Sequence, residues 1–165
     1  MHVINVVLDA TECPIQRPHH WYVQSLYYSG KKKRHTIKYE IGIHLLTGRI
    51  VWIAGPIPGS THDITLCRRS GILTMLLPGE FIMADKGYIG EAQIITPFKT
   101  PTTTQKLFNS QLGQLRVIVE NTYGRVKHFR CLKHEWTHDL SLHPLTFYFI
   151  CQLVNLDVIF HPLRQ

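Results

Sequence analysis

The chain has 165 residues, a length that fits one domain with a single hydrophobic core. Its composition of 44% hydrophobic and 18% charged residues is typical of a soluble globular protein, and its four cysteines form no CxxC pair, which argues against a disulfide framework or a zinc ribbon. The net charge of +7 and pI near 9.4 favour a polyanionic partner, most commonly nucleic acid.

The apolar runs of the chain do not predict a membrane segment. We find no run of the roughly 18 to 20 apolar residues that cross a bilayer, so no membrane partner is expected. The N-terminal segment meets Asp9 early and lacks a basic flank, which argues against a signal peptide. It resembles a strand that starts at once, and this favours a module cut from something longer.

The first half of the chain predicts strands. Residues 3–8 (VINVVL) are β-branched and apolar, as in a central strand buried on both faces that ends at Asp9. Residues 36–43 alternate between polar and apolar types with period two, which predicts a half-exposed strand. Thr47-Gly48 indicates a turn, and residues 49–54 form the returning strand of a hairpin.

The rest of the chain predicts helices around two further strands. Residues 60–63 (STHD) offer caps for a helix over residues 66–77, followed by strands at 81–84 and 94–95. A long helix is predicted from Asn109 or Ser110 to residue 129, and a second over residues 145–160, apolar nearly all round and therefore buried. This order predicts one α/β domain over residues 1–165, with helices on the faces of a mixed sheet.

Two acids follow apolar strands, Asp9 and Asp85. If these strands are parallel neighbours, both acids emerge at the carboxyl edge of the sheet, where open α/β folds bind ligands. Glu120 is the acid of the long helix, and at 100° per residue it falls within about 40° of Arg116 and Lys127. The helix can therefore pack on the sheet and present Glu120 at its margin.

Three converging carboxylates suit a hard cation, Mg²⁺ or Mn²⁺. Two such ions cleave phosphodiester bonds by activating a water or a 3′-hydroxyl and stabilising the leaving oxygen. In this hypothesis Asp9 bridges the two metals and Asp85 and Glu120 each hold one, while Lys86, Arg116 and Lys127 meet phosphates. The alternative is that each aspartate is a turn or cap residue and that Arg116–Glu120 is an ordinary helix pair.

Five segments in order resemble the catalytic domain of a PIF/Harbinger-type transposase, a eukaryotic relative of a large bacterial insertion-sequence family. They are LDATECPI around Asp9, YYSGKKKRHTIKYE, PGSTHD, ADKGY around Asp85 and RVIVENTYGRVK around Glu120, and together they cover nearly the whole chain. The resemblance implies a ribonuclease H-like fold, a mixed five-stranded sheet flanked by helices. It also implies a DNA endonuclease or strand-transferase whose Asp9, Asp85 and Glu120 bind Mg²⁺ or Mn²⁺, two ions in all.

The resemblance adds Asp63 of PGSTHD as an auxiliary acid, although our interpretation from the residues favours a helix cap. His62 beside it is a candidate for contacting metal-bound water or phosphate, with an ordinary surface histidine as the alternative. Family members usually carry an N-terminal helical DNA-binding region, and here Met1 stands almost on the first strand. We therefore expect a truncated copy, a fragment, or a protein that does not itself recognise the ends of its DNA substrate and relies on a separate DNA-binding protein.

The run Lys31, Lys32, Lys33, Arg34 fits a nuclear localisation signal or a phosphate-binding patch, with a solvated loop as the alternative. Its aromatic neighbours Trp21, Tyr22, Tyr27 and Tyr28 suit a single strand or a distorted DNA end, although we expect them to fill the edge of the sheet. We expect a nuclear protein, with a cytoplasmic pool allowed. The alternatives to the DNA enzyme are an idle, domesticated copy that binds DNA or protein, and an enzyme acting on RNA or hybrid.

Overall fold

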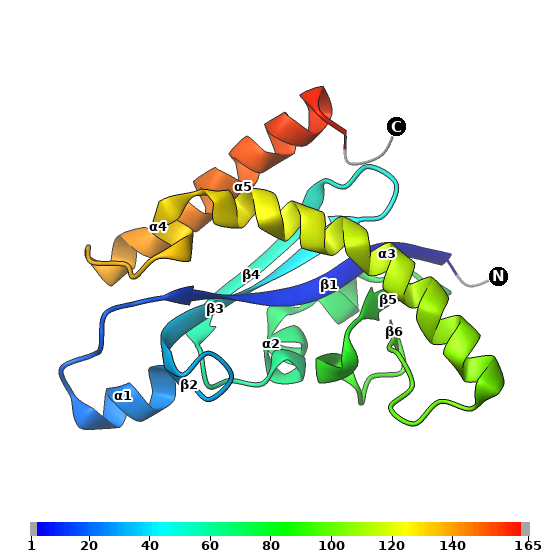
Figure 1. Cartoon of the computed structure of the whole chain (residues 1–165), viewed down its shortest axis with the longest axis horizontal. Helices are drawn as coiled ribbons and strands as arrows, with labels where there is room; N and C mark the ends of the chain where they lie inside the picture. The colour runs from blue at the N-terminus through cyan, green and yellow to red at the C-terminus, as the bar shows by residue number, and fades with distance from the viewer. Residues whose placement is uncertain (1–2, 163–165) are drawn as a thin grey trace.

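The computed structural model describes residues 3–162, drawn in Figure 1. The strands are β1 (Val3–Pro14), β2 (Tyr28–Ser29), β3 (Arg34–His44), β4 (Ile50–Pro58), β5 (Glu80–Ala84) and β6 (Ile94–Ile95). The α-helices are α1 (Trp21–Tyr27), α2 (Asp63–Ser70), α3 (Thr103–His128), α4 (Arg130–Lys133) and α5 (His143–Phe160). Three short 3₁₀ helices are η1 (Ile72–Met75), η2 (Lys86–Tyr88) and η3 (Leu140–Leu142).

The strands form one mixed sheet. Its main order is β4-β3-β1-β5-β6, with the two-residue β2 pairing the start of β3. β1 runs antiparallel to β3 and parallel to β5, and β5 runs parallel to β6. The predicted α/β class is confirmed, and the arrangement is consistent with a ribonuclease H-like fold. The sheet has six strands instead of five because β2 adds a short pair.

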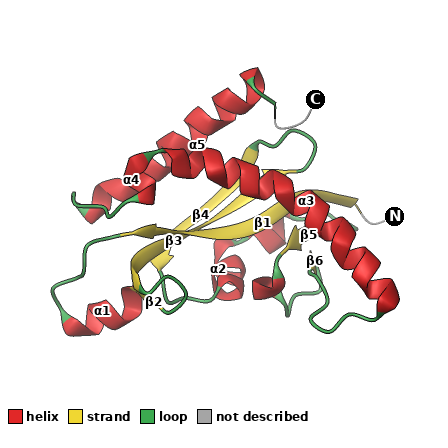
Figure 2. Cartoon of the chain, in the orientation of Figure 1, coloured by secondary structure: helices red, strands yellow, loops and turns green. Residues whose placement is uncertain are grey.

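Helices cover both faces of the sheet, as Figure 2 shows. One face packs against α3, α4 and α5 and contains the larger core, which includes Val7, Tyr39, Met83, Val119 and Phe147. The opposite face packs against α2, η1 and η2 in a smaller core that includes Leu8, Ile82, Cys67, Ile72 and Tyr88. Consecutive residues of β1, Val7 and Leu8, belong to different cores, as the two-residue period of a strand requires.

β1 is longer than predicted. The sequence indicated an end at Asp9, but the strand continues to Pro14 because residues 6–14 pair with β3. The second half of β1 alternates between buried Thr11 and Cys13 and less buried neighbours, which is a strand pattern. Asp9 therefore lies inside β1 and not in a turn after it.

Both internal helices differ from their predicted bounds. α2 begins at Asp63 and ends at Ser70 because Gly71 adopts a left-handed conformation with φ of 84°, and a 3₁₀ turn follows in place of more helix. α3 begins at Thr103, not at Asn109 or Ser110. Thr102 and Gln105 form a capping box, which starts the helix six residues before Asn109.

α5 is confirmed as a helix, but the prediction that it is buried all round is wrong. Its side chains Leu145, Phe149, Ile159 and Phe160 are exposed. Leu140–Phe160 is long and apolar enough to cross a membrane, although the sequence contains no uninterrupted apolar run of that length. Core helices of soluble proteins have the same length and composition. The inner side of α5 packs as a core helix does, because Phe147 stacks on Tyr39 of β3 at 3.8 Å.

Candidate active site

The register between β1 and β5 places two acids side by side. Leu8 of β1 lies opposite Ala84 of β5, the last residue of that strand. Asp9 directly follows Leu8, and Asp85 directly follows Ala84. The strands β1 and β5 run parallel. Both acids therefore stand at the carboxyl edge of the parallel pair, as the sequence predicted.

The side of the sheet that Asp9 faces follows from strand alternation. Asp9 shares its parity in β1 with Val7 and Cys13, whose side chains lie in the core beneath α3 and α5. From α3, the Tyr123 hydroxyl donates a hydrogen bond to the main-chain carbonyl of Asp9. Arg116 of the same helix is close enough to lower the Asp9 pKa. The long helix is thus anchored directly over the first acid.

The carboxyl of Asp9 lies among other acids. Burial raises its pKa to about 6; the amide N–H of Ala10 counters this, and the nearby Asp85 and Asp63 raise it further. Ala10 donates that hydrogen bond at 2.8 Å. The Asp9 carboxyl therefore keeps its proton to a higher pH than an ordinary aspartate does, and a cation bound among these acids would offset their repulsion.

Gly87 separates Asp85 from the auxiliary acid Asp63. A Cβ atom on Gly87 would stand 2.9 Å from Asp85 Oδ1 and 3.0 Å from Asp63 Oδ2, so both carboxylates flank this one backbone position. The Gly87 N–H also donates to Asp85 Oδ1 at 2.7 Å. The glycine of the ADKGY segment therefore lets Asp85 and Asp63 approach each other.

Asp63 is not a helix cap, contrary to the preferred sequence interpretation. It is the first residue of α2, and the N-cap is His62, which is exposed and makes no capping hydrogen bond within the described residues. Asp63 Oδ1 instead accepts from the Lys38 ammonium at 2.8 Å. Lys38 also donates to the Thr61 carbonyl at 2.6 Å and lies 3.9 Å from Glu12 Oε1.

Glu120 shares a stripe of α3 with two residues that act on Asp9, but its carboxylate does not form a group with the aspartates. By helix geometry it falls between Arg116 and Tyr123 on one stripe of α3, and both of those residues act on Asp9. The Glu120 side chain itself is exposed. Across residues 3–162, no three His, Cys, Asp or Glu side chains form a group that could hold a metal ion. Carboxylate oxygens suit a hard divalent cation, so the donor chemistry fits while the three-ligand group is not assembled.

Two of the predicted phosphate contacts share a cavity with Asp85. Lys86 and Arg116 line a cavity of about 430 Å³ together with Asp85, and Asn109 and Gly113 of α3 complete its wall. The cavity lies where β5 ends and α3 passes, so a phosphate in it would meet one acid and two cations. The position of Lys86 and Arg116 is compatible with the predicted role.

The ammonium group of Lys127, the third predicted phosphate contact, is hydrogen-bonded within the protein. Its ammonium donates to the Glu12 carbonyl at 2.7 Å, to the Leu132 carbonyl at 3.0 Å and to Cys13 Sγ at 3.2 Å. An ammonium has three N–H donors, and all three are used here. Lys127 therefore ties α3 to β1 and α4 and offers no donor to a phosphate in this arrangement.

The basic run Lys31–Arg34 is exposed at the turn between β2 and β3. A second cavity of about 310 Å³ lies beside this turn. Ser29, Gly30 and Lys31 line one part of it, and Asp63 and Gly87 line another. Lys31 of the basic turn and the auxiliary acid Asp63 therefore share one cavity.

A buried acid that the sequence did not single out lies beneath the site. Glu40 of β3 is fully buried, and burial raises its pKa to about 7. Trp52 Nε1 donates to Glu40 Oε1 at 3.3 Å, and the Ser70 and Tyr88 hydroxyls lie close enough to lower the pKa in part. Among the described residues neither Glu40 Oε2 nor the Tyr88 hydroxyl has a hydrogen-bond partner.

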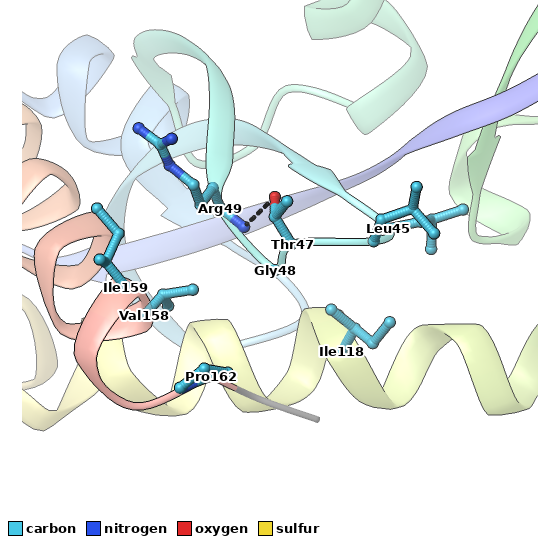
Figure 3. A pocket seen from close by; sticks show the side chains of 9 residues that line it. Leu45, Thr47, Gly48, Arg49, Ile118, Val158, Ile159 and Pro162 are labelled. Atoms are coloured by element: carbon cyan, nitrogen blue, oxygen red, sulfur yellow. Dashed lines mark hydrogen bonds between the residues drawn. The ribbon is translucent and has the colours of Figure 1, made fainter. Parts of the chain in front are cut away.

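A further cavity lies far from these acids. It has about 280 Å³ between the β3–β4 turn, α3 and α5, and Figure 3 shows Ile118, Val158 and Ile159 around it. The turn is held by the Arg49 N–H, which donates to Thr47 Oγ1 at 3.4 Å. The lining is mostly apolar and contains no acid, so this cavity does not suit metal or acid–base chemistry.

Sequence reasoning missed the roles of Lys38, Glu12, Glu40 and Tyr123. The period-two pattern of residues 36–43 assigned Thr36, Lys38 and Glu40 to a solvent face, but all three are buried because α2 and the loop before it cover that face. The polar residues alternating through β3 were the available signal. The sequence of β3 alone does not tell whether these polar side chains face water or pair inside the protein, because that depends on which element covers the strand.

Comparison with known proteins identifies the family of the chain. Residues 8–155 match the family described as DDE superfamily endonuclease. The chain is 37% identical over 141 residues to a protein of Microchaete diplosiphon named "Probable transposase for insertion sequence element IS702". The match covers 79% of this chain and 49% of that protein, so the chain spans about half the length of this relative. No solved structure matches the chain. The family match includes Asp9, Asp85 and Glu120, and the chain belongs to the DDE superfamily endonucleases.

Proposed function

We propose that this chain is the catalytic domain of a transposase that cleaves and joins DNA strands with a divalent cation. The observation that carries the proposal is the pairing of Leu8 with Ala84, which brings Asp9 and Asp85 to one edge of the sheet. The burial and the acidic neighbours that raise the Asp9 pKa support it, as does the cationic wall formed by Lys86 and Arg116.

In this proposal Asp9, Asp85 and Glu120 hold Mg²⁺ or Mn²⁺, two ions in all. Bound there, such ions activate a nucleophilic water or 3′-hydroxyl and stabilise the leaving oxygen of a phosphodiester. Lys86 and Arg116 hold the phosphates of the DNA in the cavity beside Asp85. Because Glu120 is exposed, its side chain must turn toward Asp9 when the ion binds. Asp63 is an auxiliary acid whose charge Lys38 balances.

The test combines ion binding with DNA cleavage. Wild type should bind Mn²⁺, measured by electron paramagnetic resonance, and should nick supercoiled DNA with Mg²⁺ or Mn²⁺. Asp85→Asn should lose both properties. Asp157→Asn is the matched control, because Asp157 pairs with Arg125 on the exposed side of α5. Equal nicking by wild type and Asp85→Asn, or failure of wild type to bind a divalent ion, overturns the proposal.

One observation favours a second candidate function. The acids in the described part of the chain do not form a three-ligand group, which is expected of an idle copy that binds DNA or protein. Such a protein would bind DNA in a salt-dependent manner. Its affinity would survive Asp9→Asn, Asp85→Asn and Glu120→Gln and would not require a divalent ion.

The finer assignments are also proposals. We infer a PIF/Harbinger-type enzyme from the five segments described above, although the similar protein found is an insertion-sequence transposase. We infer nuclear localisation from the exposed run Lys31–Arg34. A fluorescent fusion that stays cytoplasmic with this run intact would contradict the inference. End recognition by a separate DNA-binding protein is a further part of the proposal.

A further inference from the structure

The surface of α1 is unusual for a helix of a folded domain. None of the seven residues of α1, all of which the structure describes, is buried. Trp21 is 81% exposed and Tyr22 is 56% exposed. An exposed tryptophan has a large apolar area in water, so such residues commonly mark a contact site. The expectation that these aromatics fill the edge of the sheet is wrong for this pair.

The exposed rings form a group. His20 stacks on Tyr22 with ring centroids 5.7 Å apart, and Trp21 packs edge-on against Tyr22 at 6.3 Å. These contacts pre-order the group while most of the Trp21 ring remains in solvent. We call His20, Trp21 and Tyr22 the aromatic platform.

The basic turn follows the same helix: α1 begins at the platform, and its other end leads through β2 into the turn. Lys31, Lys32, Lys33 and Arg34 are all exposed, and α1 leads directly into β2 and this turn. Lys33 has φ of 56°, a left-handed conformation that glycine or asparagine adopts more easily. Lys33 therefore occupies a backbone conformation that is less favourable for lysine than for glycine or asparagine. Figure 1 shows α1 and β2 together at one end of the sheet.

The end of α1 opposite the platform is fixed to the loop that leads to Asp63. Ser60 Oγ donates to the Leu26 carbonyl at the end of α1 at 2.6 Å, which fixes α1 to the loop that carries Asp63. Lys31 of the basic turn and Asp63 line one cavity of about 310 Å³, and Gly87, which borders Asp85, lines it too. A strand whose phosphates follow the turn is therefore directed toward Asp63 and Gly87.

We propose that the aromatic platform and the basic turn bind unpaired nucleotides of DNA next to the reacting phosphodiester, with Trp21 and Tyr22 stacking on bases and Lys31–Arg34 contacting phosphates. Flat aromatic rings beside cations suit single strands because every base has a stacking face, whereas a duplex hides its base faces. This inference rests on the proposed function, since it takes DNA as the substrate.

The test measures affinity without divalent ions, so it does not depend on cleavage. Fluorescence anisotropy in EDTA compares a blunt duplex with the same duplex carrying a short single-stranded overhang. Trp21→Ala should weaken binding of the overhang DNA about tenfold or more, in line with stacking of one base, and should change blunt-duplex binding less than twofold. Trp21→Phe should retain most of the affinity. Phe149→Ala, which removes an exposed ring from α5, is the matched control.

A second readout uses Trp21 itself. Trp136 is buried and Trp52 is half-buried, so Trp21 is the most exposed tryptophan of the described chain. Overhang DNA should quench wild-type fluorescence, and the blunt duplex should not. The inference fails if Trp21→Ala binds both DNAs as wild type does, if it weakens both equally, or if an RNA overhang binds more than tenfold tighter than DNA.

Its failure differs from failure of the proposed function. Nicking that depends on Asp85 together with an inert Trp21→Ala would overturn only the platform. A selective loss of overhang binding in Trp21→Ala, in a protein that neither binds Mn²⁺ nor nicks DNA, would overturn only the enzyme.

Discussion

The Tyr123 hydroxyl of α3 donates a hydrogen bond to the main-chain carbonyl of Asp9 in β1. This contact joins the helix that carries Glu120 to the strand that carries the first acid. Glu120 lies one turn before Tyr123, so the hydrogen bond fixes how far along β1 the glutamate stands. Tyr123 is thus a positioning residue for the proposed site.

We therefore predict that Tyr123→Phe weakens Mn²⁺ binding several-fold while costing about 1 kcal/mol of stability, the usual net value of one hydrogen bond. Mn²⁺ titration and urea denaturation measure the two effects. Asn121→Ala, an exposed change on the same helix, is the control and should alter neither. A Tyr123→Phe protein with wild-type Mn²⁺ affinity would show that the contact only supports the fold.

The pair Lys38–Asp63 gives a second prediction. The Lys38 side chain is 8% exposed and that of Asp63 is 21% exposed, so removing the cation leaves a poorly hydrated carboxylate. Lys38→Met should lower the free energy of unfolding by about 3 kcal/mol. The double variant Lys38→Met, Asp63→Asn should recover a large part of that loss, because the stranded charge is gone.

Urea denaturation of both single variants and the double variant gives the coupling energy. Arg68→Met provides the comparison, since Arg68 pairs with Glu91 while its side chain is 54% exposed, and it should cost less than about 1 kcal/mol. Simple additivity of the Lys38 and Asp63 changes would contradict the predicted coupling.

The positions of Asp9 and Asp85 could be predicted from the sequence because the end of an apolar run is a local signal, even though β1 itself continues past Asp9. Two apolar runs followed by acids need only a parallel pairing to bring the acids together, and β1 and β5 pair in this way. These inferences used short-range patterns and one topological rule.

The roles of Lys38 and Lys127 could not be predicted in the same way. A lysine in an alternating strand or on a polar helix stripe has the same local pattern whether it meets solvent, phosphate or a buried carbonyl. Lys38 is buried because the loop before α2 folds over β3, and the half-buried Lys127 is paired because α4 turns back beside β1. The partners are far apart in sequence, so tertiary packing decides.

Glu40 makes stability depend on pH. Burial raises its pKa to about 7 in the folded protein, against an ordinary value of 4.5. Below the ordinary value both folded and unfolded states hold the proton, so burial of the charge costs nothing there. Between the two values the unfolded state loses the proton first, so stability falls as the pH rises toward 7 and the full cost is present above it.

We predict that Glu40→Gln removes this cost. Relative to wild type, the variant should gain stability progressively between about pH 4.5 and pH 7, by an amount on the order of 2 to 3 kcal/mol. Thermal unfolding of both proteins at several pH values measures the difference. Glu135→Gln, at an exposed position, should track wild type at every pH. A constant difference between Glu40→Gln and wild type would show that Glu40 does not titrate in this range.

Lys127 separates a structural cation from a DNA-binding one. Its ammonium donates to the Glu12 and Leu132 carbonyls, and Lys127→Met leaves both acceptors without that donor. We predict a loss of about 1 to 3 kcal/mol in the free energy of unfolding, with an unchanged salt dependence of DNA binding. Lys32→Met, at the exposed turn, should have the reverse effect. It should leave the stability unchanged and lower the slope of log affinity against log salt by about 0.9, as loss of one phosphate contact does. If Lys127→Met lowered that slope without loss of stability, the prediction would be wrong. The wild-type Lys127 ammonium would then exchange its three internal hydrogen bonds for a phosphate when DNA binds.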